Sequence, residues 1–459
     1  REPVWFNCRG YIIRGDQKEP LYLIGCINEI GNRQKADNIT GLLGETSLEK
    51  YFKNSVSTLN KGFLIHVGID GFKMINENYG WDYGDYVLRE TASCILSCIS
   101  DSQKVYKIAS DEFIILDTTS SDMTTASNLY DQICKHINQF IEENNFAAVF
   151  TISAGILPLP NLSQTGYAEI IKRTDFSLTM AKQHGRNCCY IFQEEEYQNF
   201  LRIREITNEL HSAVNHGFCG FSIIFQPVMD IRQDKLTGAE VLIRFASKKF
   251  GPISPAEFIP LLETSGLIIP TGHWFMREAI TACRKIRMQI PDFKVNINVS
   301  QVQITKSDII TDLISEMDAS GLPPAAIAIE LTESILLEKN EKAQNFLKKL
   351  KQAGLQLALD DFGTGYSNFH YLSELHPDIV KIDRGFTSKA ITDKKEYYLL
   401  NQFSNMIHNL GLKLCIEGIE TEDELQKIKL LKPDYCQGFY WGQPCPYDEF
   451  RKHFVDVDR

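Results

Sequence analysis

A repeated pattern in the C-terminal half constrains the fold of this chain more than any other feature. Short apolar segments there have the length and composition of buried strands, and helical patterns separate most of them. About eight strands with intervening helices in about 260 residues is the size of a (β/α)8 barrel. The strand candidates are 221–225, 236–243, 294–298, 326–331, 356–359, 379–382, 413–416 and 435–437.

Polar residues stand at or near the ends of these apolar strands. In a closed parallel barrel the carboxyl ends of the strands meet at one rim, so we expect these side chains to converge. Any single one of them could be an ordinary surface residue, and the repetition along the chain is what favours a functional site. The residues are Glu240, Asn298, Glu330, Glu333, Asp360, Asp361, Lys381, Glu417 and Gln437.

Converging carboxylates repel one another unless cations lie between them, so this pattern predicts a divalent metal site. Hard oxygen ligands without cysteine or histidine favour Mg²⁺ or Mn²⁺ over Zn²⁺. The adjacent pair Asp360 and Asp361 is suited to holding two ions close together. Two-metal sites commonly catalyse the hydrolysis of phosphodiesters.

The same half of the chain resembles the EAL phosphodiesterase family over nearly all of residues 198–459. The motif that names the family reads Glu240-Val241-Leu242, with valine in place of alanine, and Arg244 follows it. The other matching segments are Phe225-Gln226-Pro227, Asn298-Val299-Ser300, Glu330-Leu331-Thr332-Glu333-Ser334, Asp360 to Ser367, Lys381-Ile382-Asp383, Glu417-Gly418-Ile419-Glu420 and Gln437 to Gly442.

The resemblance implies hydrolysis of cyclic di-GMP to linear pGpG by two ions of Mg²⁺ or Mn²⁺. Glu240, Asn298, Glu330 and Asp360 would bind one metal, and Asp360, Asp361 and Glu417 the other. Lys381 would orient or activate the attacking water, and Gln437 would help to hold it. Glu333 would anchor a mobile loop at 361–367. The residues in contact with the dinucleotide would be Gln226, Leu242 and Arg244.

A receptor that binds cyclic di-GMP without cleaving it is the alternative function. Receptor members of this family typically lack metal ligands or the lysine, whereas this chain keeps them all, which favours the enzyme. A nuclease acting on DNA or RNA is disfavoured by the net charge of −11 and the lack of a basic stripe.

Residues 37–193 alternate strand and helix patterns and predict an α/β sandwich. We expect a strand at 63–67, a hairpin over 105–116, a strand at 147–154, and helices at 83–98 and 167–184. The region resembles the GGDEF diguanylate cyclase family, whose fold is a nucleotidyl-cyclase-like sandwich. The matching segments are 37–43, 69–76, 84–88, the signature Ala109-Ser110-Asp111-Glu112-Phe113, and 181–187.

Departures from that family predict an inactive cyclase. Ala109 and Ser110 replace two glycines that let the backbone approach the nucleotide. Gly68 stands where a metal-binding aspartate is expected, and the product-inhibition motif is missing. Asn76, Asp85, Lys182 and Arg186 still match nucleotide-contacting positions. Two main interpretations remain open, a structural or dimerising relic and a GTP-binding domain that regulates the phosphodiesterase, and residual cyclase activity is a third, less favoured one.

The N-terminal segment predicts a hairpin, with strands at 11–13 and 21–27 and a turn at Gly15-Asp16. It resembles the end of a PAS sensor domain. The expected organisation is a PAS remnant and linker at 1–36, a degenerate GGDEF domain at 37–195 and an EAL domain at 196–459. Residues 193–197 are the expected start of a helical linker between the last two.

Bulk composition places the chain among ordinary globular proteins. It has 43% hydrophobic and 23% charged residues, and no apolar run of a length that spans a bilayer. The twelve cysteines are scattered without zinc-type spacing, which predicts free thiols in a reducing cytoplasm. The family resemblance also implies a homodimer.

Overall fold

The computed structural model describes residues 6–14, 20–29, 36–55, 61–120, 122–144, 146–160, 165–332, 341–363 and 376–456. The chain divides into two compact units, Arg1–Leu201 and Arg202–Arg459. The division falls within helix α6 (Glu194–Asn215), which begins where the helical linker is expected. The precise domain limits expected from the sequence stay predictions.

The N-terminal segment forms an antiparallel hairpin of β1 (Phe6–Arg14) and β2 (Pro20–Glu29), in which Phe6 pairs with Glu29. Both expected strands are therefore present, and each is longer than its apolar stretch. The Gly15-Asp16 turn lies outside the described residues.

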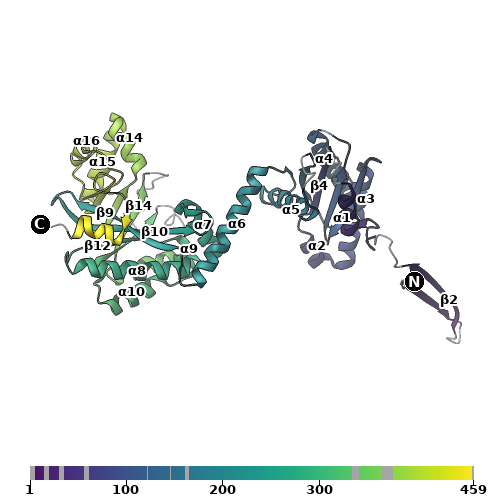
Figure 1. Ribbon diagram of the computed structural model, residues 1–459, viewed down its shortest axis with the longest axis horizontal. Helices are drawn as coiled ribbons and strands as arrows, with labels where there is room; N and C mark the ends of the chain where they lie inside the picture. Colours follow the sequence, from purple (N-terminus) through teal and green to yellow (C-terminus); the bar gives the residue numbers. More distant parts are fainter. Residues whose placement is uncertain are drawn as a thin grey trace. The chain divides into compact units, whose positions relative to one another are not determined.

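The rest of the first unit is a six-stranded sheet in the order β3-β5-β6-β4-β7-β8 with helices on both faces. The central strand β4 runs antiparallel to β6 and β7. Figure 1 shows several of these helices around β4. The strands are β3 (Leu43–Gly44), β4 (Phe63–Ile69), β5 (Gln103–Ala109), β6 (Glu112–Asp117), β7 (Ile152–Pro158) and β8 (Cys189–Ile191). The helices are α1 (Glu45–Ser55), α2 (Phe72–Tyr79), α3 (Trp81–Cys98), α4 (Met123–Glu143) and α5 (Tyr167–Gln183).

Alternation along β4 explains the two layers. Phe63, Ile65 and Val67 belong to one buried cluster, which includes side chains of α3 and α4. Leu64 belongs to a separate cluster with side chains of α1 and α5. Because successive side chains of a strand point to opposite faces, β4 supplies both cores of the predicted sandwich.

The strand expected at 147–154 is wrong in its first half. Strand β7 begins at Ile152, which pairs with Ile69, the last residue of β4. Strand β4 does not extend far enough to pair with the residues before Ile152, so these residues do not form a strand although their composition favours one. The backbone N–H of Asp70 instead donates to the carbonyl of Thr151 over 2.8 Å and ends the ladder.

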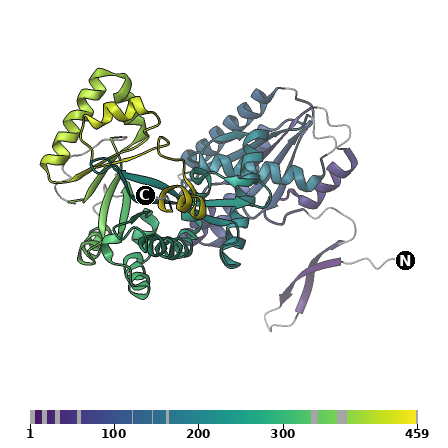
Figure 2. The ribbon, with the colours of Figure 1, turned by 60° about the vertical axis from the view of Figure 1, so that its left-hand side comes forward.

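The second unit is built on a closed barrel of eight strands, β9, β10 and β12 to β17, closed where β9 pairs with both β10 and β17. Figures 1 and 2 show the helices of this unit on the outside of these strands. The strands are β9 (Phe221–Asp230), β10 (Lys235–Ser247), β12 (Lys294–Asn298), β13 (Ile327–Thr332), β14 (Gln356–Phe362), β15 (Ile379–Ile382), β16 (Lys413–Ile416) and β17 (Tyr435–Gln437). The short strands β11 (Gly251–Ile253) and β18 (Cys445–Pro446) extend the sheet.

The barrel departs from an all-parallel one in its first strand. Strand β9 runs antiparallel to β10 and β17, whereas β10 and β12 to β17 run parallel. Only residues 231–234 join β9 to β10, and the Asp230 carboxylate accepts the backbone N–H groups of Arg232 and Gln233. A connection this short makes a hairpin and is too short for a parallel crossover.

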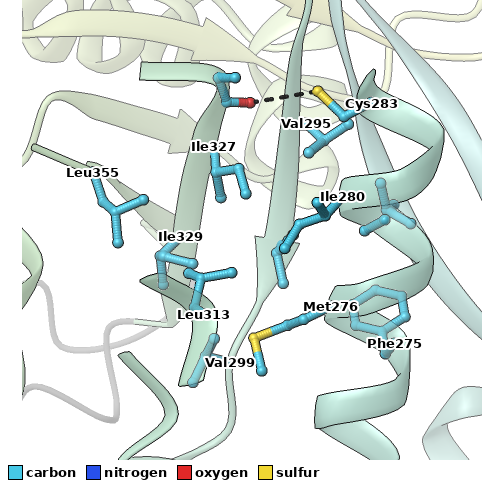
Figure 3. Packing of buried hydrophobic residues seen from close by; sticks show 14 of the residues in the cluster. Phe275, Met276, Ile280, Cys283, Val295, Val299, Leu313, Ile327, Ile329 and Leu355 are labelled. Atoms are coloured by element: carbon cyan, nitrogen blue, oxygen red, sulfur yellow. Dashed lines mark hydrogen bonds between the residues drawn. The ribbon is translucent and has the colours of Figure 1, made fainter. Parts of the chain in front are cut away.

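Helices cover the barrel by burying one apolar stripe each. Figure 3 shows Met276, Ile280 and Cys283 of α8 facing the strand that carries Val295. These side chains recur at helical spacing, so one face of α8 meets the sheet. The helices are α7 (Pro255–Ser265), α8 (Ile268–Arg287), α9 (Gln301–Lys306), α10 (Ile309–Ser320), α12 (Glu341–Gln352), α14 (Arg384–Thr392), α15 (Lys394–Asn409), α16 (Glu422–Lys429) and α17 (Tyr447–Phe450).

Candidate active site

The polar residues singled out in the sequence lie on neighbouring strands at the carboxyl end of the barrel. Register places Asn298 opposite Glu330, and Thr332 opposite Asp360. Gln226 comes from the reversed strand β9 and pairs directly with Glu240 of β10. The strand positions are Glu240 in β10, Asn298 at the end of β12, Glu330 in β13, Asp360 in β14, Lys381 in β15, Glu417 after β16 and Gln437 at the end of β17.

Lys381 is the centre of this group. Its Nζ lies 2.8 Å from Glu330 Oε1 and 2.8 Å from Glu417 Oε1. It also lies 3.2 Å from Asp360 Oδ1 and 3.4 Å from Glu240 Oε2. The side chain is only 1% exposed, so four carboxylates, three on strands and one just after a strand, meet at one buried ammonium.

Side-chain amides of asparagine and glutamine donate hydrogen bonds to the two most buried carboxylates, those of Glu240 and Glu330. Asn298 Nδ2 donates to Glu240 Oε1 over 2.9 Å, and Gln437 Nε2 donates to Glu240 Oε2 over 2.8 Å. Asn296 Nδ2 donates to Glu330 Oε1 over 2.7 Å. The sequence reasoning missed Asn296, although its place two residues before Asn298 puts both on one face of β12.

The group contains more carboxylates than cations, and this imbalance shifts the pKa values of its members. Burial raises the pKa of Glu330 well above its usual value, and Glu240 raises it further. Burial also raises the pKa of Glu417 to about 7, although Lys381 opposes the shift. Burial alone would lower the pKa of Lys381, but the surrounding carboxylates outweigh it and hold that pKa well above its usual value. Lys381 is therefore a cation, and burial disfavours the ionised forms of Glu330 and Glu417.

Oxygen atoms without partners fit a divalent metal at this place. Glu330 Oε2 and Gln437 Oε1 are buried and accept no hydrogen bond. With all four acids ionised, one lysine would leave three negative charges uncompensated. In the described residues no three acidic, histidine or cysteine side chains form a ready metal cage. The four acids contact Lys381 instead. Hard oxygen donors with surplus negative charge suit Mg²⁺ or Mn²⁺.

The adjacent aspartates owe their placement to an irregularity in β14. The register shifts between Leu359 and Phe362, and Asp361 has a positive φ of 54°. This bulge interrupts the alternation that would send two successive side chains to opposite faces. Burial raises the pKa of Asp361, and the charge of Asp360 raises it further, so the two carboxyl groups feel one another.

The expected substrate residues line cavities beside this group. A cavity of about 220 Å³ is lined by Gln226, Glu240, Leu242, Glu417 and Gln437 together with Phe439. Leu242 also lines a second, larger cavity with Arg244 and Asn298. Glu333 and residues 364–367 of the expected loop lie outside the described residues.

Comparison with protein families agrees with this geometry. The model described as "EAL domain" matches residues 207–444, just over half of the chain. The chain belongs to the EAL domain family. The model described as "Diguanylate cyclase, GGDEF domain" matches residues 34–188, so a GGDEF domain precedes the EAL domain. Nothing in these comparisons tests the PAS resemblance of the N-terminal hairpin.

Two curated relatives match most of this chain. The chain is 27% identical over 421 residues to the bifunctional diguanylate cyclase/cyclic di-GMP phosphodiesterase MucR of Pseudomonas aeruginosa, covering 90% of this chain and 60% of MucR. It is 26% identical over 456 residues to the cyclic di-GMP phosphodiesterase PdeR of Escherichia coli, covering 97% of this chain and 68% of PdeR. The chain spans about half to two thirds of the length of such curated relatives.

A solved structure of the EAL enzyme Bd1971 in its cAMP-bound form is similar in fold. The TM-score is 0.53 at 25% identity, and the match covers 66% of this chain and 80% of that one. The likeness includes the EAL barrel and supports the architecture described above.

In the GGDEF domain, three of the four expected nucleotide-contacting residues line one cavity. Asn76, Lys182 and Arg186 border a space of about 440 Å³, whereas Asp85 does not line it. Lys182 Nζ lies 3.1 Å from the point that a side chain at Gly68 would first occupy. The position where the family has a metal-binding aspartate is therefore next to the ammonium of Lys182 in this chain.

Asp70 is also engaged within the GGDEF domain. Its carboxylate accepts hydrogen bonds from Thr151 Oγ1 at 2.7 Å and Ser153 Oγ at 2.8 Å. The backbone N–H of Asn187 adds a third at 3.2 Å. A carboxylate held by three donors has less capacity left to bind a metal.

Two further expectations concern the whole chain. None of the described helices is both long and apolar enough to cross a bilayer. The ten cysteines whose side chains are described are free thiols, as the sequence predicts.

Proposed function

We propose that the EAL domain is a phosphodiesterase that hydrolyses cyclic di-GMP to linear pGpG with two divalent ions, Mg²⁺ or Mn²⁺. The observation that carries the proposal is the convergence of Glu240, Glu330, Asp360 and Glu417 on Lys381. The names of MucR and PdeR as cyclic di-GMP phosphodiesterases support the choice of substrate.

Metal binding in this proposal uses the acids that crowd Lys381. Glu240, Asn298, Glu330 and Asp360 would hold one ion, and Asp360, Asp361 and Glu417 the second, with Asp360 shared. When bound, the ions lower the pKa of a water and offset charge on the phosphate. Glu330 Oε2 is buried and has no hydrogen-bond partner, so it is the oxygen atom most clearly available as a metal ligand.

Lys381 and Gln437 would position the attacking water. Its acidic neighbours raise the pKa of Lys381, so the ammonium would donate a hydrogen bond to the water and supply positive charge. Gln437 Nε2 donates hydrogen bonds to Glu240 and Gln226, and its Oε1 is left as a buried acceptor without a partner. Glu333 would anchor the loop that begins at Asp361.

Substrate binding would use the rim beside the metals. Gln226, Leu242 and Arg244 lie on β9 and β10 and border the two cavities described above. The guanidinium of Arg244 donates to the carbonyl of Ile243, and its remaining donors can meet a phosphate or a base.

A receptor that binds cyclic di-GMP without cleavage is less well supported, because every expected metal ligand and the lysine are present. We propose that the GGDEF domain does not make cyclic di-GMP, and that it serves either as a structural relic or as a GTP-binding regulator. A homodimer is also proposed.

The test of hydrolysis is direct. The purified chain with Mg²⁺ or Mn²⁺ should convert cyclic di-GMP to pGpG, as measured by chromatography of the products. The variant Glu240→Ala should form no pGpG. Glu278→Ala, at an exposed position on α8, is the control that should keep full activity. Intact substrate after prolonged incubation of the wild-type chain with either metal contradicts the proposal.

The state of the GGDEF domain is tested in parallel with GTP. We expect no cyclic di-GMP or pGpG from GTP and Mg²⁺. Calorimetry with GTP separates the two remaining roles, since heat of binding together with a changed rate of hydrolysis supports regulation. An absence of both supports the relic.

A further inference from the structure

Another cavity of the EAL domain has no part in the proposed reaction. It measures about 420 Å³, a volume in the range of small-molecule sites. It lies between the end of α9, the start of α10 and one face of α12. None of the described residues that line it borders the two cavities beside the acidic group. A ligand in this cavity would therefore occupy a separate site.

Helix α12 contributes two lysines to this cavity. Lys342, Phe346 and Lys349 line it, and their spacing of three and four residues places them on one face of the helix. Lys342 Nζ donates to the carbonyl of Thr305 over 2.7 Å, and Lys349 Nζ lies 2.7 Å from Asp308 Oδ2. These contacts hold both ammonium groups against the segment that forms the opposite wall.

The cavity is basic although the chain is acidic. Lys306 also lines it, is exposed, and makes no ion pair or hydrogen bond with a described residue. The described lining residues therefore carry three ammonium groups and a single carboxylate, that of Asp308. The net charge of the chain is −11, so a gathering of lysines runs against its composition. Neighbouring ammonium groups repel one another unless an anion lies between them.

Local helix preferences account for only part of this gathering. Lys306 and Lys349 stand in the last turns of α9 and α12, where the helix dipole favours cations. Lys342 is the second residue of α12, and the dipole disfavours a cation at that end. Its presence at the cavity therefore needs another reason, and an anionic ligand supplies one.

Neutral groups add hydrogen-bonding capacity to the walls. The side-chain amide of Asn345 offers donors, and the hydroxyl oxygens of Thr305 and Ser307 offer acceptors. Both hydroxyl groups already donate to backbone carbonyls of α9, at 2.9 Å and 2.7 Å. Ile309 and Ile310 begin α10, so their N–H groups lack a partner within that helix. The cavity thus presents donors for an anion and acceptors for hydroxyl groups.

We propose that this cavity binds a small phosphate monoester, with the phosphate among the three lysines and a sugar-sized remainder against Thr305 and Ser307. A phosphate monoester carries a charge of about −1.5 to −2 at pH 7 and three strong acceptor oxygens. This charge matches the surplus of two ammonium groups over the carboxylate of Asp308. A phosphodiester carries a single negative charge, so the cavity selects against it.

Calorimetry on the whole chain tests ligand class, in EDTA and in a buffer without phosphate. EDTA removes divalent ions that could bind phosphate elsewhere. Ribose 5-phosphate and inorganic phosphate should both bind. Dimethyl phosphate, a diester, should bind about tenfold or more weakly, because it lacks one charge that the ammonium groups would pair with.

Three variants test the place of binding. Lys306→Gln should weaken the binding of ribose 5-phosphate by about tenfold or more, as for loss of a charged hydrogen bond. Asp308→Asn should strengthen it, because the change removes a carboxylate and frees Lys349. Lys348→Gln is the matched control, an exposed lysine of α12 outside the described lining, and should bind as wild type does. Loss of the fold would not produce effects of opposite sign.

Several results would overturn the proposal. One is an absence of binding of ribose 5-phosphate to wild type, whether or not inorganic phosphate binds. Another is equal affinity for dimethyl phosphate. Unchanged affinity in both Lys306→Gln and Asp308→Asn would place the ligand elsewhere, and loss of binding in Arg186→Gln would then assign it to the cavity of the GGDEF domain. Hydrolysis of cyclic di-GMP is measured separately, and none of these results depends on it.

Discussion

At the scale of single residues, Lys381 is the side chain on which the site depends. The sequence marked it as one polar residue among several strand ends, any one of which could be an ordinary surface residue. Residue types and strand positions were enough to predict that these groups gather. They could not predict that one ammonium meets four carboxylates, because that depends on the shear of a closed barrel.

Replacing Lys381 by methionine removes the only described cation in contact with these acids. Breaking a buried ion pair leaves charges uncompensated, so the free energy of unfolding in EDTA should fall by about 3 kcal/mol or more. Hydrolysis should fall by about 10²-fold or more, as for loss of one positioned donor. Chemical denaturation and product chromatography measure the two effects. Lys389→Met, at an exposed position on α14, is the control, and equal stability of Lys381→Met and wild type in EDTA would be the contrary result.

Glu330→Gln should separate stability from activity. Burial and Glu240 raise the pKa of Glu330, so its charge already adds little to the stability of the metal-free chain. The amide keeps an oxygen for Lys381, and the unfolding midpoint in EDTA should stay the same or rise. Hydrolysis should be lost because Glu330 Oε2 is the unpartnered donor atom. A large loss of stability in the variant would show that the ionised carboxylate holds the barrel together.

At the scale of elements, sequence patterns located strands better than they located directions and ends. The four-residue strand at 379–382 is where its apolar run predicts, because both faces are buried. The reversal of β9 and the late start of β7 were not predicted. Each depends on which strand is available as a partner, and the local composition of a segment does not report that.

His66 ties three elements of the first unit together and gives that unit a pH dependence. From β4 it lies 3.1 Å from Glu112 of β6 and 3.2 Å from Asp175 of α5. Burial lowers the pKa of His66, but the two carboxylates outweigh burial and raise it. The stabilisation is therefore complete below the unfolded pKa, about 6.5, and is lost as pH rises through the folded value.

We expect the first unit to unfold at a higher temperature near pH 6 than near pH 8.5, measured by calorimetry on the whole chain. In His66→Gln this pH dependence should weaken, because the group that binds the proton is gone. The exposed His136→Gln should behave as wild type. An unchanged pH dependence in His66→Gln would assign the effect to other groups.

At the scale of the whole chain, the sequence predicted the two folds and their order, because each region carries several family motifs in sequence along its length. It also predicted which residues form the acidic group. The larger cavity, bordered by Leu242, Arg244 and Asn298, was not foreseen. Its parts come from β10, α7, α8 and β12, and they acquire meaning only when the helices pack on the barrel.

The surplus of acid predicts that metal stabilises the chain as well as activating it. A ligand that binds only the folded state adds about 2.7 kcal/mol at a free concentration of about 100 times its Kd. Titration with Mn²⁺ should therefore raise the unfolding midpoint of the EAL domain, and EDTA should reverse the rise. Asp360→Asn should reduce this gain, because Asp360 is the proposed shared ligand. A gain of the same size in wild type and Asp360→Asn would place the metal elsewhere, whereas its loss together with loss of pGpG formation ties binding and catalysis to the same carboxylate.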